Sequence, residues 1–101
     1  MAEPTKVARR SALAEGEPLA VQVGEQPIAL FLVDGDVVAT AGKCPHAGGP
    51  LHKGSVCDGK LSCPWHGWTY DLATGECEES DDITLQRFEV RVEGDDVWVL
   101  V

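Results

Sequence analysis

Two short motifs, each pairing a cysteine with a histidine, contain the residues most able to do chemistry. Cys44-Pro-His46 has one residue between the pair, Cys63-Pro-Trp-His66 has two, and sixteen residues (47–62) separate the motifs. Two thiolates and two imidazoles are good ligands for iron and zinc. The set fits a two-iron cluster in which the cysteines ligate one iron and the histidines the other. It also contains the ligand types of a tetrahedral zinc site.

The spacing favours the iron–sulfur cluster over zinc. Structural zinc sites more often combine a Cys-x-x-Cys type pair with a His-x₃₋₅-His pair, whereas each motif here mixes the two residue types. Two neutral imidazoles in place of two thiolates leave less negative charge on the cluster, so the reduction potential rises above that of an all-cysteine cluster. The chemistry predicted for these residues is therefore one-electron transfer. Glycines beside the motifs suit a close-fitting loop with bare N–H donors: Gly42, Gly48, Gly49 and Gly67.

Short runs rich in β-branched residues, with little helix, predict an all-β domain that positions these motifs. Asp34-Gly35, Asp58-Gly59 and Gly94-Asp95 each lie between two such runs and predict hairpins. Residues 11–15 predict either one helical turn with Ser11 as its N-cap or a loop. The strands are expected at 19–23, 28–33 (as a central strand), 36–41, 54–57, 60–63, 68–70, 87–93 and 96–101, with a turn at 71–75.

The Asp58-Gly59 hairpin predicts how the two motifs meet. Both motifs fall in loops beside it, so the hairpin brings the first Cys/His pair next to the second. Loops held on a rigid sheet are a common place for a metal site. Residues 43–71 are therefore expected to form a cluster-binding subdomain inserted in a larger β base.

Size and charge exclude several classes of function. The length of 101 residues predicts one domain, 1–101. The 8 Lys and Arg residues against 17 Asp and Glu give a net charge of −9, which argues against nucleic-acid and anionic-membrane partners. The longest apolar run, 28–33, is too short to span a membrane, and the first ten residues lack the apolar region of a secretory signal. We expect a cytoplasmic protein that is a monomer in solution.

The residues around the ligands resemble a known family. Cys44-Pro-His-Ala-Gly-Gly-Pro-Leu51 and Cys63-Pro-Trp-His-Gly-Trp-Thr-Tyr-Asp71 look like the soluble Rieske-type ferredoxins of bacterial aromatic-ring oxygenase systems. The resemblance is strong over 42–76, weaker over 87–101 and loose before residue 20. It implies a Rieske fold, made of three small antiparallel sheets with a [2Fe–2S] cluster at one tip. It also implies that Cys44 and Cys63 ligate one iron and His46 and His66 the other.

The resemblance further implies an electron carrier between an NAD(P)H-dependent flavoprotein reductase and a terminal ring-hydroxylating oxygenase. The substrate-oxidising site is not expected in this chain, because a non-haem oxygenase needs a separate iron held by two histidines and a carboxylate, and only His52 is left over. No glycine-rich dinucleotide fingerprint follows a strand either. The alternative is the small Rieske-type subunit of an assimilatory nitrite reductase. The sequence does not name the oxygenase or its substrate.

Departures from related sequences predict the reduction potential. Quinol-oxidising Rieske proteins have a disulfide between the cluster loops, at the positions of Gly49 and Trp65, and a hydroxyl residue at the position of Trp68. Without these groups fewer hydrogen bonds reach the cluster sulfurs, so we expect a potential near the low end of the Rieske range, about −150 mV. Residues 80–84 replace a segment that often contains proline in the resembled family.

The remaining candidate residues are assigned simpler roles. His52 is expected to be a loop residue and not a ligand, and Cys57 and Cys77 are expected to be unpaired thiols, since a disulfide is disfavoured in a reducing compartment. Trp65 and Trp68 either lie on an electron path or pack the cluster loops; packing is the default for aromatic residues, and Trp65, between two ligands, is expected to shield the cluster from water. An acidic run is either a solvated loop or a docking surface for a basic partner: Asp71, Glu76, Glu78, Glu79, Asp81 and Asp82.

Overall fold

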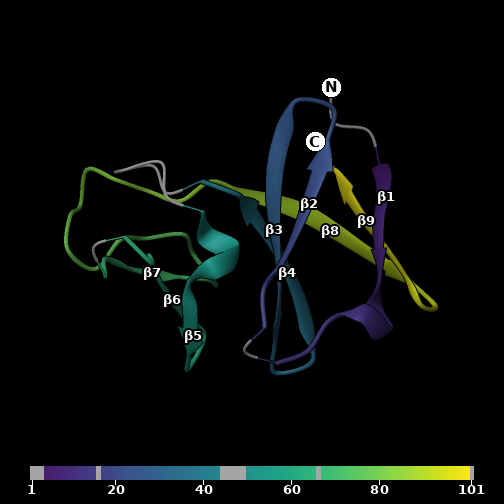
Figure 1. The fold of residues 1–101 in the computed structure, drawn as a ribbon, viewed down its shortest axis with the longest axis horizontal. Coiled ribbons are helices and arrows are strands. Elements are labelled where there is room, and N and C mark those ends of the chain that lie inside the picture. Colours follow the sequence, from purple (N-terminus) through teal and green to yellow (C-terminus); the bar gives the residue numbers. More distant parts are fainter. Residues whose placement is uncertain (1–3, 16, 44–49, 66, 101) are drawn as a thin grey trace.

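The described part of the chain folds into two antiparallel sheets that stand side by side (Figure 1). The computed structural model describes residues 4–15, 17–43, 50–65 and 67–100. None of the helices in these ranges is long and apolar enough to cross a membrane. The elements are β1 (Pro4–Arg9), η1 (Arg10–Ala12), β2 (Leu19–Val23), β3 (Gln26–Val33), β4 (Asp36–Ala41), η2 (Leu51–Lys53), β5 (Ser55–Cys57), β6 (Lys60–Ser62), β7 (Thr69–Asp71), β8 (Arg87–Glu93) and β9 (Asp96–Leu100).

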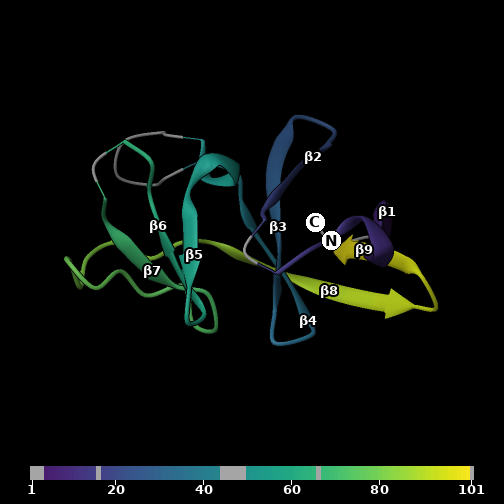
Figure 2. The same cartoon turned by 60° about the horizontal axis from the view of Figure 1, so that its bottom comes forward.

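The larger sheet has six strands in the order β1-β9-β8-β4-β3-β2, and the smaller has the order β5-β6-β7. The larger sheet is two three-stranded halves, because β4 and β8 are paired at Ala39–Phe88 and Thr40–Arg87 alone. Together with the small sheet, seen apart from them in Figure 2, these halves correspond to the three small sheets that the family resemblance implies. The all-β prediction is confirmed.

β3 holds the two sheets together because both of its faces are buried. Successive side chains of a strand point to opposite faces. Ala29 and Phe31 pack toward the small sheet, whereas Ile28 and Leu30 pack on the opposite side of the large sheet. This explains the continuously apolar run at 28–33. The prediction of a central strand is right for burial, although β3 lies next to the edge strand β2 in the sheet order.

The two faces of β3 belong to two separate cores. The loop-side core consists of Ala29, Phe31, Leu51, Leu61, Cys63, Tyr70, Leu72, Cys77 and Leu85. The base core consists of Leu13, Ile28, Leu30, Ala39, Val97 and Val99. Strands that belong to hairpins far apart in the sequence meet in each core, so each core holds several hairpins together.

All three predicted hairpins are present. Asp34 and Asp58 have φ of 49° and 52°, and the glycines that follow them have φ of 85° and 75°. Two successive residues with positive φ form the type I′ turn, which matches the twist of the flanking strands. The third hairpin joins β8 to β9, and β7 begins one residue later than predicted.

The prediction of Ser11 as a helix N-cap is wrong. The short 3₁₀ turn η1 begins at Arg10, and the residue at its N-cap position makes no capping hydrogen bond. Ser11 instead donates its backbone N–H and its hydroxyl to the carboxylate of Asp95, at 2.9 Å each, and so ties η1 to the β8–β9 hairpin. These hydrogen bonds lower the pKa of Asp95, the side-chain bond most. A partner distant in sequence has replaced the local cap.

Candidate metal centre

The described residues on either side of the first ligand motif are fixed in place. Lys43 and Pro50 face each other across an antiparallel bridge, and the Leu51 N–H donates to the Gly42 carbonyl at 3.0 Å. The Gly42 N–H in turn donates to the Pro27 carbonyl of β3 at 2.9 Å. The loop is therefore anchored on the large sheet. Its predicted ligands Cys44 and His46 lie outside the described residues.

The second ligand motif lies in a loop closed by backbone hydrogen bonds across its base. The Cys63 N–H donates to the Trp68 carbonyl at 2.8 Å, and the Gly67 N–H donates to the Cys63 carbonyl at 3.0 Å. Gly67 has a φ of 74°, as predicted for a glycine in this loop, because L side chains rarely adopt that conformation. His66, the other predicted ligand of this motif, is not among the described residues.

The β5–β6 hairpin brings the bases of the two loops together. Ser55 pairs with Ser62, so the chain just before β5 lies opposite the chain just after β6. A Cβ on Gly54 would clash with the Ser62 carbonyl and lie 3.2 Å from the Leu51 carbonyl. Only glycine allows these segments to approach so closely. The predicted role of this hairpin is supported by the described parts of both loops.

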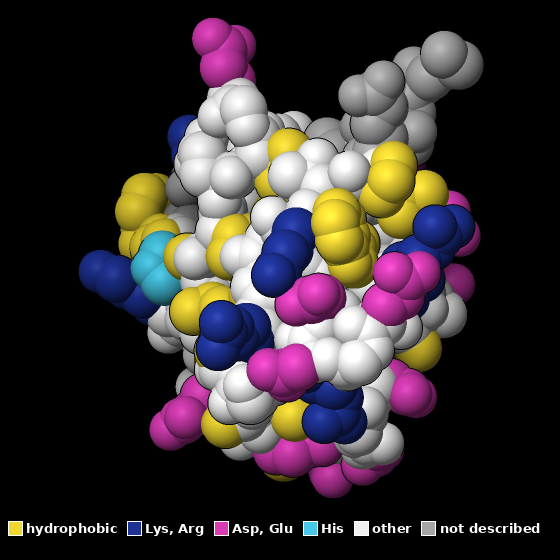
Figure 3. All heavy atoms as spheres, turned by 90° about the vertical axis from the view of Figure 1, so that its right-hand side faces the viewer, with side chains coloured by type: hydrophobic (Ala, Val, Ile, Leu, Met, Phe, Trp, Pro, Cys, Tyr) yellow, Lys and Arg dark blue, Asp and Glu magenta, His cyan; other side chains and the backbone are white. Residues whose placement is uncertain are grey.

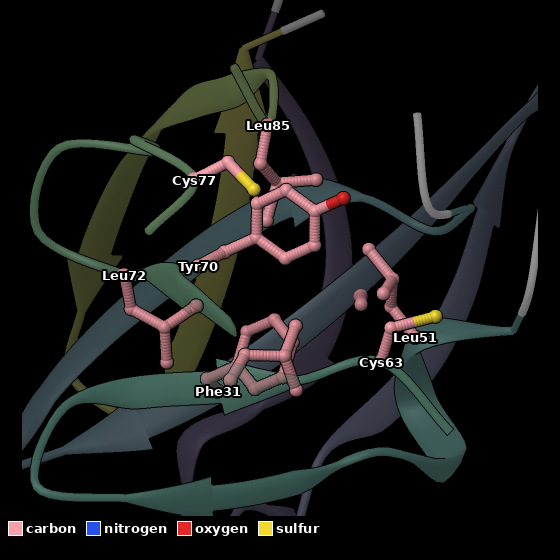
Figure 4. Packing of buried hydrophobic residues seen from close by; sticks show 9 residues of the cluster. Phe31, Leu51, Cys63, Tyr70, Leu72, Cys77 and Leu85 are labelled. Carbon is pink, nitrogen blue, oxygen red and sulfur yellow. The ribbon is translucent and has the colours of Figure 1, made fainter. Parts of the chain in front are cut away.

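Cys63 is the predicted ligand that the structure describes, and its position suits a cluster. Its side chain is 2% exposed and lies at the edge of the loop-side core beside Leu51, with its sulfur directed away from Tyr70 and Leu72 (Figure 4). A thiolate in an apolar, water-poor place on a closed loop is a suitable ligand for a cluster. No group of three candidate ligands occurs within the described ranges, which hold only Cys63 of the four predicted ligands.

Tyr70 is a residue of the site that the sequence reasoning missed. It is fully buried in the loop-side core, and its ring lies beside the sulfur of Cys77 (Figure 4). Tyr70 lies four residues after His66, so its buried ring helps to hold the second ligand loop in place. The apolar alternation of Thr69-Tyr70-Asp71 with Leu72 could have identified it as an inward-facing residue.

The two cysteines outside the motifs form no disulfide in the structure, as predicted. Cys57 is exposed at the end of β5, whereas Cys77 is 6% exposed within the loop-side core. The Cys77 Sγ lies 3.8 Å from a carboxylate oxygen of Glu79. Cys77 is therefore a buried small side chain, and Cys57 is an accessible thiol.

The three tryptophans differ in how far their side chains are buried. Trp68 is partly buried against the loop-side core, which confirms its packing role. Trp65 is 63% exposed, which argues against the prediction that it packs the loop. Trp98 is partly buried in β9, and its Nε1 is buried with no hydrogen-bond partner among the residues that the structure describes.

The acidic run is only partly free to meet a partner. The Lys60 ammonium donates a hydrogen bond to the Glu78 carboxylate, and this bond, together with the charge of Glu78, raises the pKa of Lys60. Glu79 accepts the Thr69 N–H at 2.7 Å, which fixes the chain beside β7. Asp81 and Asp82 are exposed. The run thus combines structural carboxylates with solvated ones.

Comparison with known proteins decides the family. The model of the Rieske [2Fe–2S] domain matches residues 3–99 of the 101. This chain belongs to the Rieske family. The predicted cofactor, a [2Fe–2S] cluster of Rieske type, and the predicted fold are confirmed with it. The assignment of the four individual ligands stays a prediction.

Two relatives differ in how much of them the chain covers. It is 35% identical over 88 residues to human apoptosis-inducing factor 3, of whose length it spans only 14%. It is 34% identical over 96 residues to the ferredoxin component of biphenyl 2,3-dioxygenase from Rhodococcus jostii, covering 94% of this chain and 90% of that protein.

Two solved structures illustrate the range of fold relatives. A chain in the complex of reduced oxygenase and oxidized ferredoxin of carbazole 1,9a-dioxygenase has a TM-score of 0.84 and 31% identity, covering 94% of this chain and 99% of that one. A protein assigned as an NADH-dependent nitrite reductase small subunit from Mycobacterium tuberculosis has a TM-score of 0.91, covering 100% of this chain and 96% of that one. At 21% identity, the second likeness concerns the fold alone.

Proposed function

We propose that this chain is a one-electron carrier that takes electrons from an NAD(P)H-dependent flavoprotein reductase and passes them to a terminal ring-hydroxylating oxygenase. The observation that carries the proposal is the similarity to a dioxygenase ferredoxin component over 94% of this chain and 90% of the relative. The chain itself would not be a catalyst. We place it in the cytoplasm as a monomer, where exposed thiols such as Cys57 persist in reduced form.

The proposed ligands are Cys44 and Cys63 on one iron and His46 and His66 on the other, within a cluster-binding subdomain at 43–71 of the domain 1–101. When bound, the cluster supplies a centre that gains and loses one electron. The chain holds the ligand loops still: backbone hydrogen bonds close their bases, and the apolar core keeps water from Cys63. Rigid placement of ligands by packed supporting residues is the usual requirement of such a site.

The alternative is the small Rieske-type subunit of a nitrite reductase, which the fold likeness keeps open. A subunit that is permanently attached to a large enzyme needs a large exposed apolar face. Among the described residues, the exposed large hydrophobic side chains are Trp65, in the segment between β6 and β7, and Val92, in β8 of the large sheet. This distribution favours the free carrier. Gel filtration of the protein alone, and with a candidate reductase, separates the two functions.

The test of the proposed function is a redox titration followed by electron paramagnetic resonance on anaerobically purified protein. We expect a one-electron Rieske signal with a midpoint potential of about −150 mV, which suits electrons supplied by NAD(P)H. A midpoint well above zero would indicate a quinol-type donor instead. Absence of a signal in a zinc-containing protein would leave a structural metal module.

The ligand assignment is tested by single substitutions. His46→Ala and His66→Cys are expected to lose or transform the cluster spectrum, because each removes one imidazole from the predicted set. His52→Ala is the matched control and is expected to leave the spectrum unchanged. Bleaching of the His52→Ala protein would show that the ligand set is wrong.

A further inference from the structure

A surface cavity of about 360 Å³ lies beside the first ligand loop. One wall is the β2–β3 hairpin, and the other is formed by the two chain segments that enter and leave the loop. The antiparallel bridge between Lys43 and Pro50 holds these segments together. Five of the nine lining residues are apolar, and the only ionisable ones are Lys43 and His52. The apolar lining residues are Ala20, Val21, Pro27, Ile28 and Pro50.

The chain segment that contributes Lys43, Pro50 and His52 to this cavity has a positive charge in an otherwise acidic protein. The stretch 37–57 contains no aspartate or glutamate, although the whole chain has a net charge of −9. Its lysines, Lys43 and Lys53, are exposed and form no salt bridge with any residue of the described ranges. The other two lysines of the chain are paired, with Asp96 and with Glu78. Lys43, which lines the cavity, and Lys53, which directly follows the lining residue His52, are therefore available to an outside carboxylate.

Figure 3 shows a histidine side chain at the left edge of one face, next to hydrophobic and to Lys or Arg side chains. An apolar cavity with a basic rim is complementary to an apolar side chain flanked by a carboxylate, because the cavity removes the apolar group from water and the ammonium groups meet the charge.

We propose that this basic-rimmed cavity docks a segment of the electron-transfer partner in which a carboxylate lies next to an aliphatic side chain. The aliphatic side chain enters the cavity, and the carboxylate faces Lys43 and Lys53. Since Lys43 immediately precedes the predicted ligand Cys44, a partner held here sits beside the ligand loop. The naming of the partner as a redox protein rests on the proposed function.

The first test uses the cluster-containing protein and an acetylated, amidated Asp-Leu-Asp-Leu peptide, followed by nuclear magnetic resonance. We expect saturable shifts at Ala20, Val21 and His52, and none with the matched Asn-Leu-Asn-Leu peptide. In Lys43→Glu/Lys53→Glu, binding is expected to weaken about tenfold, since two surface attractions become repulsions. The control Arg9→Glu/Arg91→Glu makes the same change of net charge on the base strands and is expected to bind normally.

The second test fills the cavity without changing charge. Ala20→Phe is expected to abolish peptide binding, whereas Ala12→Phe, an exposed alanine in η1, is expected to preserve it. Absorbance and paramagnetic resonance confirm that every variant keeps its cluster. Failure of the wild-type protein to bind the peptide saturably, or equal binding by both charge-reversal variants, would overturn the docking site.

The third measurement separates this inference from the proposed function. With an oxygenase that accepts electrons, Lys43→Glu/Lys53→Glu is expected to raise the KM for the carrier about tenfold at low salt and much less at high salt, because salt screens exposed charges. An unchanged KM would overturn the docking proposal while the carrier function stands. If peptide binding depends on the lysines but no oxygenase accepts electrons from the protein, the docking site is supported and the partner is not a redox protein.

Discussion

The small sheet and the large sheet reach stability in different ways. Strands of the large sheet have five to eight residues and bring a core of their own, whereas each strand of the small sheet has three residues. A three-residue strand forms few ladder hydrogen bonds and buries little area. The small sheet is instead held by Phe31 and Ala29 of β3 and by glycines that allow backbone segments to touch. The ligand loops therefore depend on packing against side chains of the large sheet.

The largest effect that tests this comparison is expected from neighbouring residues of β3. Phe31→Ala removes the β3 side chain under the small sheet and should cost about 3–5 kcal/mol of unfolding free energy, with loss of the cluster. Leu30→Ala removes a side chain from the base core and should cost about 2–5 kcal/mol. We expect the folded fraction of Leu30→Ala to keep its cluster. Urea unfolding measures the stability of each variant, and the iron content per folded molecule measures how much cluster it keeps. Equal cluster loss in the two variants would contradict the division into two cores.

A smaller effect is expected at the glycines. Gly75 has a φ of 85°, and a Cβ there would clash with the Leu85 carbonyl, so Gly75→Ala should cost about 2–4 kcal/mol. Gly94 has a φ of 60° and no heavy atom within 4 Å of a built Cβ, so Gly94→Ala should cost about 1 kcal/mol for backbone strain alone. Thermal unfolding compares them. Similar losses would show that the small sheet does not rely on this close approach.

The acidic run allows structural and docking carboxylates to be separated. Asp81→Asn/Asp82→Asn is expected to slow electron delivery to a basic partner several-fold at low salt with little change in stability. Glu79→Gln should instead lower stability by roughly 1 kcal/mol, because the charged acceptor of the Thr69 N–H is lost. Stopped-flow rates at two salt concentrations and denaturant unfolding resolve the two roles. A rate that is insensitive to both aspartates would remove the run as a docking surface.

The smallest effect is expected at the far end of the base. Ser11 lowers the pKa of Asp95, so the carboxylate contributes stability above the pKa of an unfolded aspartate, about 4, and that contribution is lost as the pH falls through the lower folded-state pKa. Ser11→Ala should lower the Tm slightly at pH 7, and the difference from the wild-type protein should shrink as the pH falls through the lowered pKa of Asp95. A Tm difference that does not change with pH would show that Ser11 acts through packing and not through this charge.

The hairpins were the most predictable part of the fold. An Asp-Gly pair between two β-rich runs determines a turn through the backbone freedom of two residues, so Asp34 and Asp58 revealed their turns without any tertiary context. Two errors had distant causes. The partner of Ser11 lies 84 residues away, and the exposure of Trp65 depends on the room left by neighbouring loops.

The sequence by itself determined the chemistry, because metal ligation depends on residue type and short spacing, and Cys-x-His with Cys-x-x-His is specific for a Rieske centre. It also determined the hairpins, whose turns are local. The tertiary structure decided which face of β3 packs under the ligand loops, that Tyr70 and Cys77 are buried together, and that Lys43 and His52 border one cavity with Ala20. These juxtapositions arise from packing between segments distant along the chain, which spacing alone does not specify.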